Sequence, residues 1–419
     1  GEYEALPTKL GDPSWKPDFG PSDFTEQARR SGATVIGARP FLIAYNVNLN
    51  TRNTKRAMKI AALVREKGIL RRDENFEIVR DSEGNGIRDP GLFKSVKGIG
   101  WYIEEYGCCQ VSLNLTDYRI SSVHAVLEGV REVALREGVV VTGSELIGLI
   151  PIEAMLDAGR FYLERQSLNP GASEQQLIEM AIRSLGLRDL GEFDPDQRII
   201  ERRIGSDGPL VGMTIRDFVD TLGSDAPAPG GGSVASLCGA MAAGLAAMVG
   251  QLTTGKRGLE DQFEAMNSMA VEAQQLKDGF LYDVDADTAA FDQWMAARGL
   301  PKKTPEEKKA RAQAIRAARR EAIDVPLRVL ERTTRTLELV EIALQGNPNC
   351  LSDAGVGALT AVACAEGAWY NVYINLDGFR DGEAAAEYRR RADQALEAAQ
   401  THAKTISSRI RKSLREAAS

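Results

Sequence analysis

The sequence predicts an α+β ferredoxin-like domain, with the element order β-α-β-β-α-β, followed by an all-α helical-bundle domain. Strand and helix signals alternate between residues 33 and 150, whereas no convincing strand signal is found beyond residue 204. The 419 residues, 43% of them hydrophobic, are enough for two or three domains with cores of their own. We therefore expect domains over 1–203 and 212–419, joined by a linker at 204–211.

The elements of the first half follow from hydrophobic periodicity and from turn residues. We expect a β-rich stretch at 34–50 and an amphipathic helix at 52–67. Two strands are expected at 95–105 and 108–116, a second helix at 120–137 and a last strand at 139–143. The polar, glycine-containing segment 71–92 predicts a mobile surface loop, and 145–186 predicts short helices.

The second half reads as a series of helices separated by glycine and proline. They are expected at 214–222, 232–253, 258–297, 305–345, 352–377 and 381–416. Helices of this length exceed what one small domain needs, so we expect a homo-oligomer formed through this domain, as an obligate dimer with its site at or near the subunit contact. Small residues on the second of these helices would let another helix approach closely: Gly239, Ala240, Ala243, Gly244 and Ala247.

Composition excludes several classes of protein. The net charge of -7 and the isoelectric point near 5.3 provide no broad attraction for nucleic acid. Five cysteines without a CxxC pair argue against a disulfide framework or a structural zinc site and indicate a reducing compartment. We find no apolar run of about 18 residues, so we expect a cytoplasmic protein without a membrane span.

A glycine run opens one of the predicted helices. In "APAPGGGSVASL", Gly230, Gly231 and Gly232 expose backbone N–H groups, and Ser233 is expected to cap the helix. Such a helix start suits an anionic or electron-rich group of a ligand. The alternative is a tight turn that only starts a helix.

The stretch "FLYDVDADTAAF" carries the most informative acidic residues. Phe280, Val284, Asp287 and Phe291 share one helix face, which places Asp287 within an apolar stripe. A carboxylate desolvated there either keeps a charged partner or has the raised pKa that a proton shuttle requires. Asp285 lies about 160° to 200° around the helix and cannot form a simple pair with Asp287. A buried structural salt bridge at Asp287 is the competing interpretation.

Four further residues of the second half are candidates for ligand contact. Lys302 projects from the junction in "LPKKTPEEK", where it could neutralise a ligand carboxylate or pair with Asp287, or be merely exposed. Asp353 stands at a helix start, while Asn371 and Asn375 lie one turn apart on a face of small residues. Amides in that position can recognise a heterocycle's edge or can bond helix to helix.

A polar sheet face is expected in the first half. Asn46 and Asn48 share a strand face, and period two places a second set of polar side chains on a neighbouring strand: Gln110, Ser112 and Asn114. "KGIGWYIEE" adds Lys97 and Trp101. A face of amides and hydroxyls without apolar cover favours a polar ligand groove over a second hydrophobic layer.

Seven motifs together resemble the bifunctional formiminotransferase-cyclodeaminase family. "GATVIGARPFLIAYNVNLNT", "VKGIGWYIEE" and "QVSLNLTDY" are similar to the C-terminal transferase subdomain, and "APAPGGGSVASL", "DVDADTAAF", "LPKKTPEEK" and "YNVYINL" to the cyclodeaminase. The resemblance implies transfer of a formimino group from formiminoglutamate to N5 of tetrahydrofolate. It also implies ring closure of the product to methenyltetrahydrofolate with loss of ammonia, in histidine breakdown.

The resemblance also implies site residues and partners. The glycine run, Asp285, Asp287, Lys302 and the asparagines are expected near the cyclodeaminase site, with Asp353 among the substrate contacts, and Asp287 is our expected proton shuttle, with Asp285 as substitute. A folate-contacting loop is expected beside the polar sheet face, comprising Gly20, Pro21, Ser22, Asp23, Phe24, Gly32 and Arg39. Tetrahydrofolate, expected to be polyglutamylated, is the substrate and carrier, with no metal.

Two expectations qualify this assignment. The family's N-terminal transferase subdomain, which carries a catalytic histidine, is expected to be absent from this chain, which leaves the transferase incomplete unless another polypeptide supplies that subdomain. His124 does not match that motif. The rival functions are a methenyltetrahydrofolate cyclohydrolase, and a non-catalytic folate-binding or oligomer scaffold.

Overall fold

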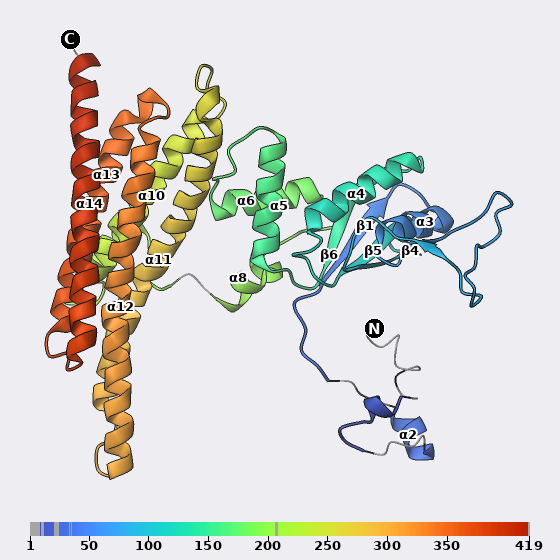
Figure 1. Cartoon of the computed structure of the whole chain (residues 1–419), viewed down its shortest axis with the longest axis horizontal. Helices are drawn as coiled ribbons and strands as arrows, with labels where there is room; N and C mark the ends of the chain where they lie inside the picture. Colours follow the sequence, from blue (N-terminus) through green and yellow to red (C-terminus); the bar gives the residue numbers. More distant parts are fainter. Residues whose placement is uncertain are drawn as a thin grey trace. The chain divides into compact units, whose positions relative to one another are not determined.

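The computed structural model describes residues 9, 12–20, 25–32, 34, 36–205 and 208–417. It divides into two units, Gly1–Phe41 and Leu42–Ser419 (Figure 1). The described part of the first unit contains a short 3-10 helix, Pro13–Trp15, and the helix α2, Glu26–Ser31, both with exposed residues. The Lys9 ammonium lies 3.5 Å from the centre of the Trp15 ring, a cation–π contact.

The second unit begins with a four-stranded antiparallel sheet in the order β4-β5-β1-β6. Its strands are β1 (Ile43–Leu49), β4 (Val96–Ile103), β5 (Cys108–Leu115) and β6 (Val141–Ile147). Helices α3 (Thr54–Val64) and α4 (Val123–Arg136) pack on one face of this sheet (Figure 1). Along the chain these elements run β-α-β-β-α-β.

Alternation along the strands separates a core face from a polar face. Tyr45, Val47, Val111 and Leu113 are buried on the side covered by α3 and α4. Gly100 allows α3 to lie directly on β4, because a Cβ at this position would come within 2.1 Å of the Ala57 carbonyl carbon. The sheet therefore buries one face under helices and keeps its amide-bearing face on the other side.

Several predicted boundaries in the first half are corrected. The expected β-rich stretch at 34–50 forms a strand only from Ile43, because the segment before it includes Pro40, which has no N–H to donate. The last strand runs over Val141–Ile147 rather than 139–143. Segment 71–92, predicted as a mobile loop, contains paired backbone instead: β3 (Arg88–Asp89) pairs with β2 (Ile69–Leu70), with further bridges at Arg72–Ile78 and Arg80–Gly86.

Short helices follow the sheet, as predicted for 145–186. They are α5 (Ile152–Arg165), α6 (Glu174–Leu185), α7 (Pro195–Arg198) and α8 (Ile200–Ile204). The segment between α5 and α6 touches the helical region, since Asn169 Nδ2 donates to Thr254 Oγ1 at 2.9 Å and Gln251 Nε2 donates to the Gly171 carbonyl at 2.6 Å.

From residue 208 onward the described chain is helical, which confirms the predicted helices within a few residues. The long elements are α9 (Ile215–Leu222), α10 (Gly231–Thr253), α11 (Phe263–Gly299), α12 (Pro305–Ala343), α13 (Leu351–Leu376) and α14 (Gly382–Ala417). Short 3-10 helices, Glu260–Gln262 and Pro348–Cys350, precede α11 and α13. Helix α10 packs against α11, α12 and α13.

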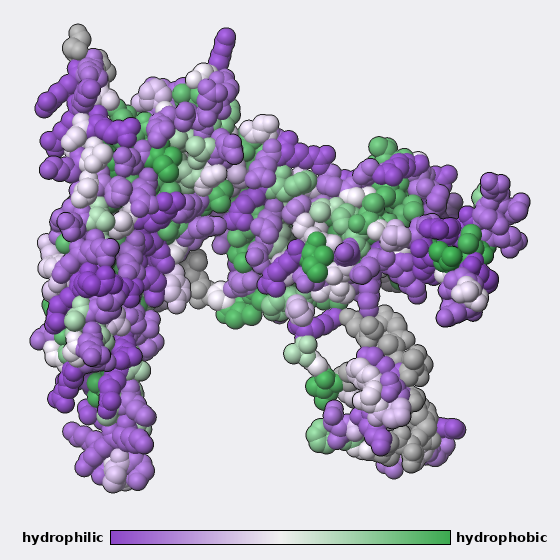
Figure 2. All heavy atoms as spheres, in the orientation of Figure 1, coloured by the Kyte–Doolittle hydropathy of each residue, from purple (hydrophilic) through white to green (hydrophobic). Residues whose placement is uncertain are grey.

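Helix α10 corrects the expectation that no segment is long and apolar enough to cross a membrane. Its 23 residues meet that test by length and composition, and 61% of its most apolar window is buried inside the bundle. Alanine and glycine make up 11 of the 23 residues of the helix, which lets its neighbours approach closely. The surrounding helices present a mainly hydrophilic outer face (Figure 2). A buried position among other helices is typical of a core helix.

Two glycines of α10 provide a test of this packing. A Cβ at Gly239 would lie 2.6 Å from the buried Phe280 ring, whereas a Cβ at Gly244 would meet nothing within 4 Å. We predict that Gly239→Ala lowers the free energy of unfolding by about 1–3 kcal/mol through overpacking. Gly244→Ala, the matched control, should raise it by about 0.5–1 kcal/mol through helix propensity. Urea denaturation measures both, and equal effects would contradict the packing described.

Candidate active site in the helical region

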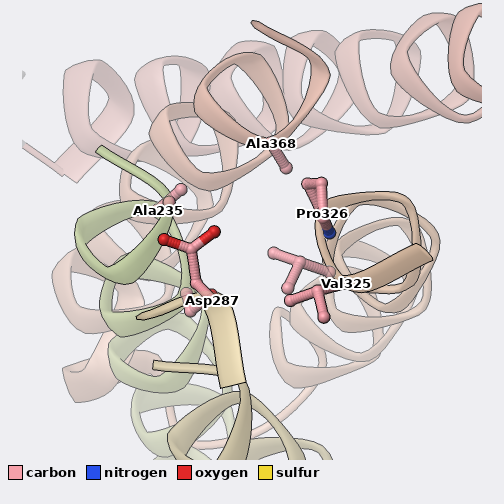
Figure 3. Close-up of a pocket in the computed structure, with 8 residues that line it drawn as sticks. Ala235, Asp287, Val325, Pro326 and Ala368 are labelled. Carbon is pink, nitrogen blue, oxygen red and sulfur yellow. The ribbon is translucent and has the colours of Figure 1, made fainter. Parts of the chain in front are cut away.

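A narrow cavity, too tight to hold a water molecule, lies between α10, α11, α12 and α13. Asp287 is its only charged lining residue. Its carboxylate lies beside Ala235, while Val325 and Pro326 stand on the opposite side (Figure 3). The complete lining is Gly232, Ala235, Ser236, Asp287, Val325, Pro326, Val329 and Ala368.

The Asp287 carboxylate is packed against the start of α10. A Cβ at Gly232 would lie 2.2 Å from Asp287 Oδ1, so glycine is required there to make room for the carboxylate. Burial raises the pKa of the Asp287 carboxyl above its ordinary value, the backbone N–H of Ser233 acts against that rise, and the negative charge of Asp283 adds to it. The predicted desolvated carboxylate at Asp287 is thus present, and no ion pair to it is found among the described residues.

The buried ion pairs that we considered for Asp287 are made by Asp283, one turn earlier. Asp283 is fully buried, and its Oδ1 accepts hydrogen bonds from Arg328 Nε at 3.0 Å and Nη2 at 2.7 Å. Its Oδ2 pairs with Arg332 Nη1. Asp283 was not among the predicted site residues, although an aspartate four residues before Asp287 shares its helix face.

Asp285 has backbone partners on a different side of α11. Its Oδ1 accepts the Leu210 N–H at 2.8 Å, and its Oδ2 accepts the Val211 N–H at 3.2 Å. A Cβ at Gly208 would lie 2.1 Å from the same carboxylate. Asp285 therefore anchors the segment that leads into the helical region, and this geometry favours a structural role over that of a substitute proton shuttle.

The glycine run starts α10, but Ser233 does not cap it. Gly230 is the N-cap residue and makes no side-chain cap hydrogen bond. The buried Ser233 hydroxyl instead donates to the Val284 carbonyl at 2.9 Å and ties α10 to α11. The expected cap is thus wrong by position, because Ser233 already lies within the first turn. Gly231 is exposed at this helix start.

Pro326 and Asn375 together explain a break in the α12 hydrogen-bond ladder. A proline inside a helix has no N–H for the carbonyl four residues earlier, which here belongs to Ala322. Asn375 Nδ2 donates to that carbonyl at 2.6 Å. Asn375 therefore bonds helix to helix, the competing interpretation of this residue. Asn371 donates to the Gly367 carbonyl at 2.7 Å, with its amide nitrogen close to Gly231.

Two predicted site residues do not reach the cavity. Lys302 is exposed in the turn after α11, and the part of α11 from Asp287 to Gly299 alone spans about 18 Å, so a pair with Asp287 is excluded within this chain. Asp353 lies in the first turn of α13, about 27 Å along that helix from Asn371. Sequence spacing could not reveal that the two ends of these helices lie far apart.

The predicted polar sheet face is present and is organised around two carboxylates that the sequence analysis missed. Asn46 Nδ2 and Gln110 Nε2 donate to Glu145 Oε2 at 3.3 and 3.1 Å. Gln110 also donates to Asn48 Oδ1 at 2.8 Å, and Asn48 Nδ2 donates to Asp189 Oδ2 at 2.9 Å. Asn46, Asn48 and Gln110 are buried within this network.

Register places the other predicted residues of that face. Ser112 lies opposite Asn46 and Asn114 opposite Ala44, while Lys97 and Trp101 of β4 lie opposite Asn114 and Gln110. Trp101 is exposed. Glu145 was missed because the strand was predicted to end at 143, and period two from Gly143 leads directly to it. Asp189, which follows α6, has no sequence signal of this kind.

The predicted folate-contacting loop belongs to the first unit. Gly20 and Gly32 have positive φ angles of 87° and 68° and, like Arg39, are exposed. Pro21, Ser22, Asp23 and Phe24 lie outside the described residues, so the contact of this loop with folate stays a prediction. Within the described part of the chain, no group of three or more His, Cys, Asp or Glu side chains is arranged to hold a metal ion.

Comparison with known protein families matches both halves of the chain. The family described as "Formiminotransferase domain" matches residues 44–205, and the family described as "Formiminotransferase-cyclodeaminase" matches residues 214–394. A chain with these two regions is a bifunctional folate-dependent one-carbon enzyme of histidine degradation.

Two formimidoyltransferase-cyclodeaminases are similar in sequence to nearly the whole chain, and a cyclohydrolase is similar to part of it. The formimidoyltransferase-cyclodeaminase of Rattus norvegicus is 39% identical over 410 residues, 97% of this chain and 72% of that protein. The one from Sus scrofa is 40% identical over 416 residues, 98% of this chain and 73% of that protein. The methenyltetrahydrofolate cyclohydrolase of Methylorubrum extorquens is 41% identical over 184 residues, 44% of this chain and 88% of that protein. The chain belongs to the formimidoyltransferase-cyclodeaminase family.

The expectation of an incomplete transferase is not supported. The formiminotransferase domain lies in this chain, over residues 44–205. That expectation rested on where the transferase-like motifs begin in the sequence. Tetrahydrofolate is accordingly a substrate and carrier of a family whose transferase and cyclodeaminase regions are both present here.

The raised pKa of Asp287 predicts a pH-dependent stability difference. A carboxyl whose pKa is raised by folding binds its proton more tightly in the folded state, so the free energy of unfolding falls as pH rises from the ordinary value of 3.8 through the raised value. Asp287→Asn removes this loss. We predict that the variant gains stability relative to the parent across that window and gains none below it. Denaturant titrations at several pH values give the difference, and a constant difference would contradict the burial of a titrating carboxyl.

The bond between Asn375 and the Ala322 carbonyl predicts energetic coupling to Pro326. Asn375→Ala should lower the free energy of unfolding by about 1–3 kcal/mol, because a carbonyl loses its partner. In a Pro326→Ala background the N–H of residue 326 can bond to Ala322, so Asn375→Ala should cost about 1 kcal/mol less. A double-mutant cycle by urea denaturation measures this difference. Additive effects would show that Asn375 acts elsewhere.

Proposed function

We propose that the helical region closes the ring of 5-formiminotetrahydrofolate, giving 5,10-methenyltetrahydrofolate and ammonia, with Asp287 as the proton shuttle. The observation that carries this proposal is a desolvated carboxylate with raised pKa, lining an apolar cavity without a cation partner among the described residues. Family membership supplies the reaction, and the cavity supplies the candidate residue.

The reaction needs a group that both accepts and donates a proton. N10 attacks the carbon of the formimino group on N5, which reacts in its protonated amidinium form, and the N10 proton passes to the Asp287 carboxylate. The protonated Asp287 then delivers a proton to the departing nitrogen, which leaves as ammonia while the N5–C–N10 unit becomes a delocalised cation. A carboxyl with a pKa raised towards neutrality can serve both steps, and its ionised form favours the positive charge of the product.

The size of the cavity limits what it can hold. It is too tight to hold a water molecule, whereas common ligand pockets enclose roughly 300–1,000 Å³. We infer that the folate lies beside the start of α10, at the half-buried Gly230 and the exposed Gly231, and that only its reacting end approaches Asp287. Asn371, with its amide near Gly231, is our candidate contact for the pterin edge.

The sheet domain is our candidate for formimino transfer from formiminoglutamate to tetrahydrofolate. The polar face supports this proposal, since its buried amides are fixed by Glu145 and Asp189, and Trp101 offers an exposed ring beside them. Asn46, Asn48, Gln110, Ser112 and Asn114 remain its proposed contacts, together with Lys97. The strand order and antiparallel pairing support a ferredoxin-like classification of this domain.

Other parts of the assignment are proposals as well. We propose domains over 1–203 and 212–419, a homo-oligomer formed through the long helices, a cytoplasmic location, and folate with a polyglutamate tail. Exposed apolar side chains on α11 and α13 support the oligomer: Tyr282, Phe291, Met295, Leu359, Tyr370 and Ile374.

The test of function is an assay with the purified chain. With 5-formiminotetrahydrofolate, ammonia and the methenyl absorbance should rise together; with formiminoglutamate and tetrahydrofolate, the same product should appear if the transferase is active. The similarity to a cyclohydrolase makes hydrolysis of methenyltetrahydrofolate the second candidate. Loss of methenyl absorbance without ammonia release would favour that candidate, and a folate-binding chain without turnover would favour a scaffold.

Asp287→Asn tests the residue assignment. The variant keeps the shape of the side chain but cannot exchange protons, so kcat for ammonia release should fall about 10²- to 10⁴-fold. Asp278→Asn on the same helix is the matched control, since Asp278 is half exposed and pairs with Lys277. The control should retain parental kcat. Full activity in Asp287→Asn would move the chemistry to another residue.

A further inference from the structure

Two carboxylates on adjacent turns of α11 differ sharply in their partners. Asp283 is fully buried and shares its two oxygens between Arg328 and Arg332 of α12, whereas Asp287, on the same helix face, lines the cavity. The spacing of four residues places their Cβ atoms about 5–6 Å apart. The proposed reaction uses Asp287 and gives no role to Asp283 or its arginines.

We propose that Asp283 is a positioning residue of the cyclodeaminase site. Its ion pairs with Arg328 and Arg332 hold in place the segment of α12 that lines the cavity opposite Asp287. Asp287 remains the carboxylate that exchanges protons. The inference rests on the proposed cyclodeamination and deepens it. Asp283 has no proposed contact with the reacting atoms, so it acts through the arginines and through α12.

Helix α12 carries both the arginines that pair with Asp283 and the residues that line the cavity opposite Asp287. Arg328 and Arg332 lie one turn apart on α12. The cavity-lining residues of α12 occupy the same stretch of helix: Val325, Pro326 and Val329. Pro326 removes one ladder hydrogen bond from that stretch, so the carboxylate–guanidinium pairs supply fixed contacts where the helix itself has lost one. Loss of the ion pairs to Asp283 would allow this segment of α12 to shift relative to Asp287.

Glycine at position 279 shows that the structure makes room for this cluster. A Cβ there would lie 2.9 Å from the guanidinium carbon of Arg332, one turn before Asp283. The same guanidinium carbon stands 5.3 Å from the centre of the Phe280 ring. Arg332 thus passes close to the α11 backbone at Gly279, and a methyl group there would force the flexible end of the Arg332 side chain to shift.

The charges around Asp287 come mainly from this cluster. The residues that α10 and α13 present to the cavity are uncharged: Gly232, Ala235, Ser236 and Ala368. Those that α12 presents there are Val325, Pro326 and Val329, and Asp285 on α11 bonds to the linker. Nearby Asn371 and Thr288 are also neutral. Among the described residues, Asp283 is therefore the charged group that acts on Asp287, and its negative charge raises the pKa of the Asp287 carboxyl.

Removal of the Asp283 charge should change the proton affinity of Asp287. Asp283 contributes to the raised pKa of Asp287, so Asp283→Asn deletes that contribution and leaves the Arg328 and Arg332 guanidinium groups without their carboxylate partner. Both changes favour the ionised form of Asp287. A shift of the acidic limb of the kcat profile towards lower pH follows, by about one unit or more.

The main experiment compares the pH dependence of kcat for 5-formiminotetrahydrofolate in the full chain and in Asp283→Asn. The expected result is a lower maximal kcat and an acidic limb displaced to lower pH. The matched control is Glu272→Gln, which removes a carboxylate from the Glu272–Arg335 pair, with bonds of 2.6 and 2.7 Å between the same two helices. Glu272 stands about 22 Å along α11 from Asp287, so its removal should leave the limb in place.

The outcomes separate positioning from a loss of stability. An unmoved limb in Asp283→Asn, or an equal displacement in Glu272→Gln, overturns the proposal. If Asp283→Asn does not fold, Gly279→Ala replaces it: all charges are kept while the Arg332 guanidinium is displaced. Gly279→Ala should lower kcat at least about tenfold with a limb moved less than in Asp283→Asn, as expected for lost preorganisation. Parental kcat in Gly279→Ala overturns the positioning role.

Failure of the proposed function is distinguishable from failure of this inference. If the parent chain releases no ammonia, cyclodeamination itself is wrong. The coupling is then measured without turnover, by a double-mutant cycle of Asp283→Asn and Asp287→Asn in the free energy of unfolding at acidic and neutral pH. A coupling that changes with pH supports interaction of the two side chains, and additivity at both pH values overturns it.

Discussion

Burial of two carboxylates one turn apart on α11 is the constraint on which the rest of the helical region depends. An ionised carboxylate is costly inside a bundle unless cations or hydrogen bonds compensate it. Asp283 receives that compensation from Arg328 and Arg332, while Asp287 receives a single backbone N–H and has a raised pKa. The same helix face therefore holds one group fixed in its charge and one able to change it, which is the property that a proton shuttle needs.

Close packing around Asp287 depends on residues without bulk. Gly232 leaves the space that the carboxylate occupies, and Gly279 leaves the space that Arg332 crosses. Pro326 contributes differently, since it frees a backbone carbonyl that Asn375 must satisfy from α13. These contacts join α10, α11, α12 and α13 around one cavity, so the glycine run starts a helix and also shapes the site.

Local sequence patterns predicted much of the fold because helices and strands carry their own periodicity. The six long helices of the second half follow from 3.6-residue spacing interrupted by glycine and proline, and the strands β4 and β5 follow from period two. The pattern failed where pairing partners decide the boundary: β6 continues to Ile147 because it pairs with β1, and segment 71–92 pairs with itself. Such pairing links residues far apart or in irregular turns, which a periodicity within one segment does not record.

The sequence by itself determined which side chains share a face: Asp287 with an apolar stripe, the glycine run at a helix start, and the amides of β1 and β5 on one side of a sheet. Only the tertiary structure decided which of these faces meet. In the folded chain the arginines of α12 pair with Asp283 and not with Asp287. Asp189 accepts a hydrogen bond from Asn48. Lys302 and Asp353 lie far from the cavity. The physical reason is that the pKa and the role of an acidic group depend on neighbours from other helices, whose distances are set by packing and not by position along the chain.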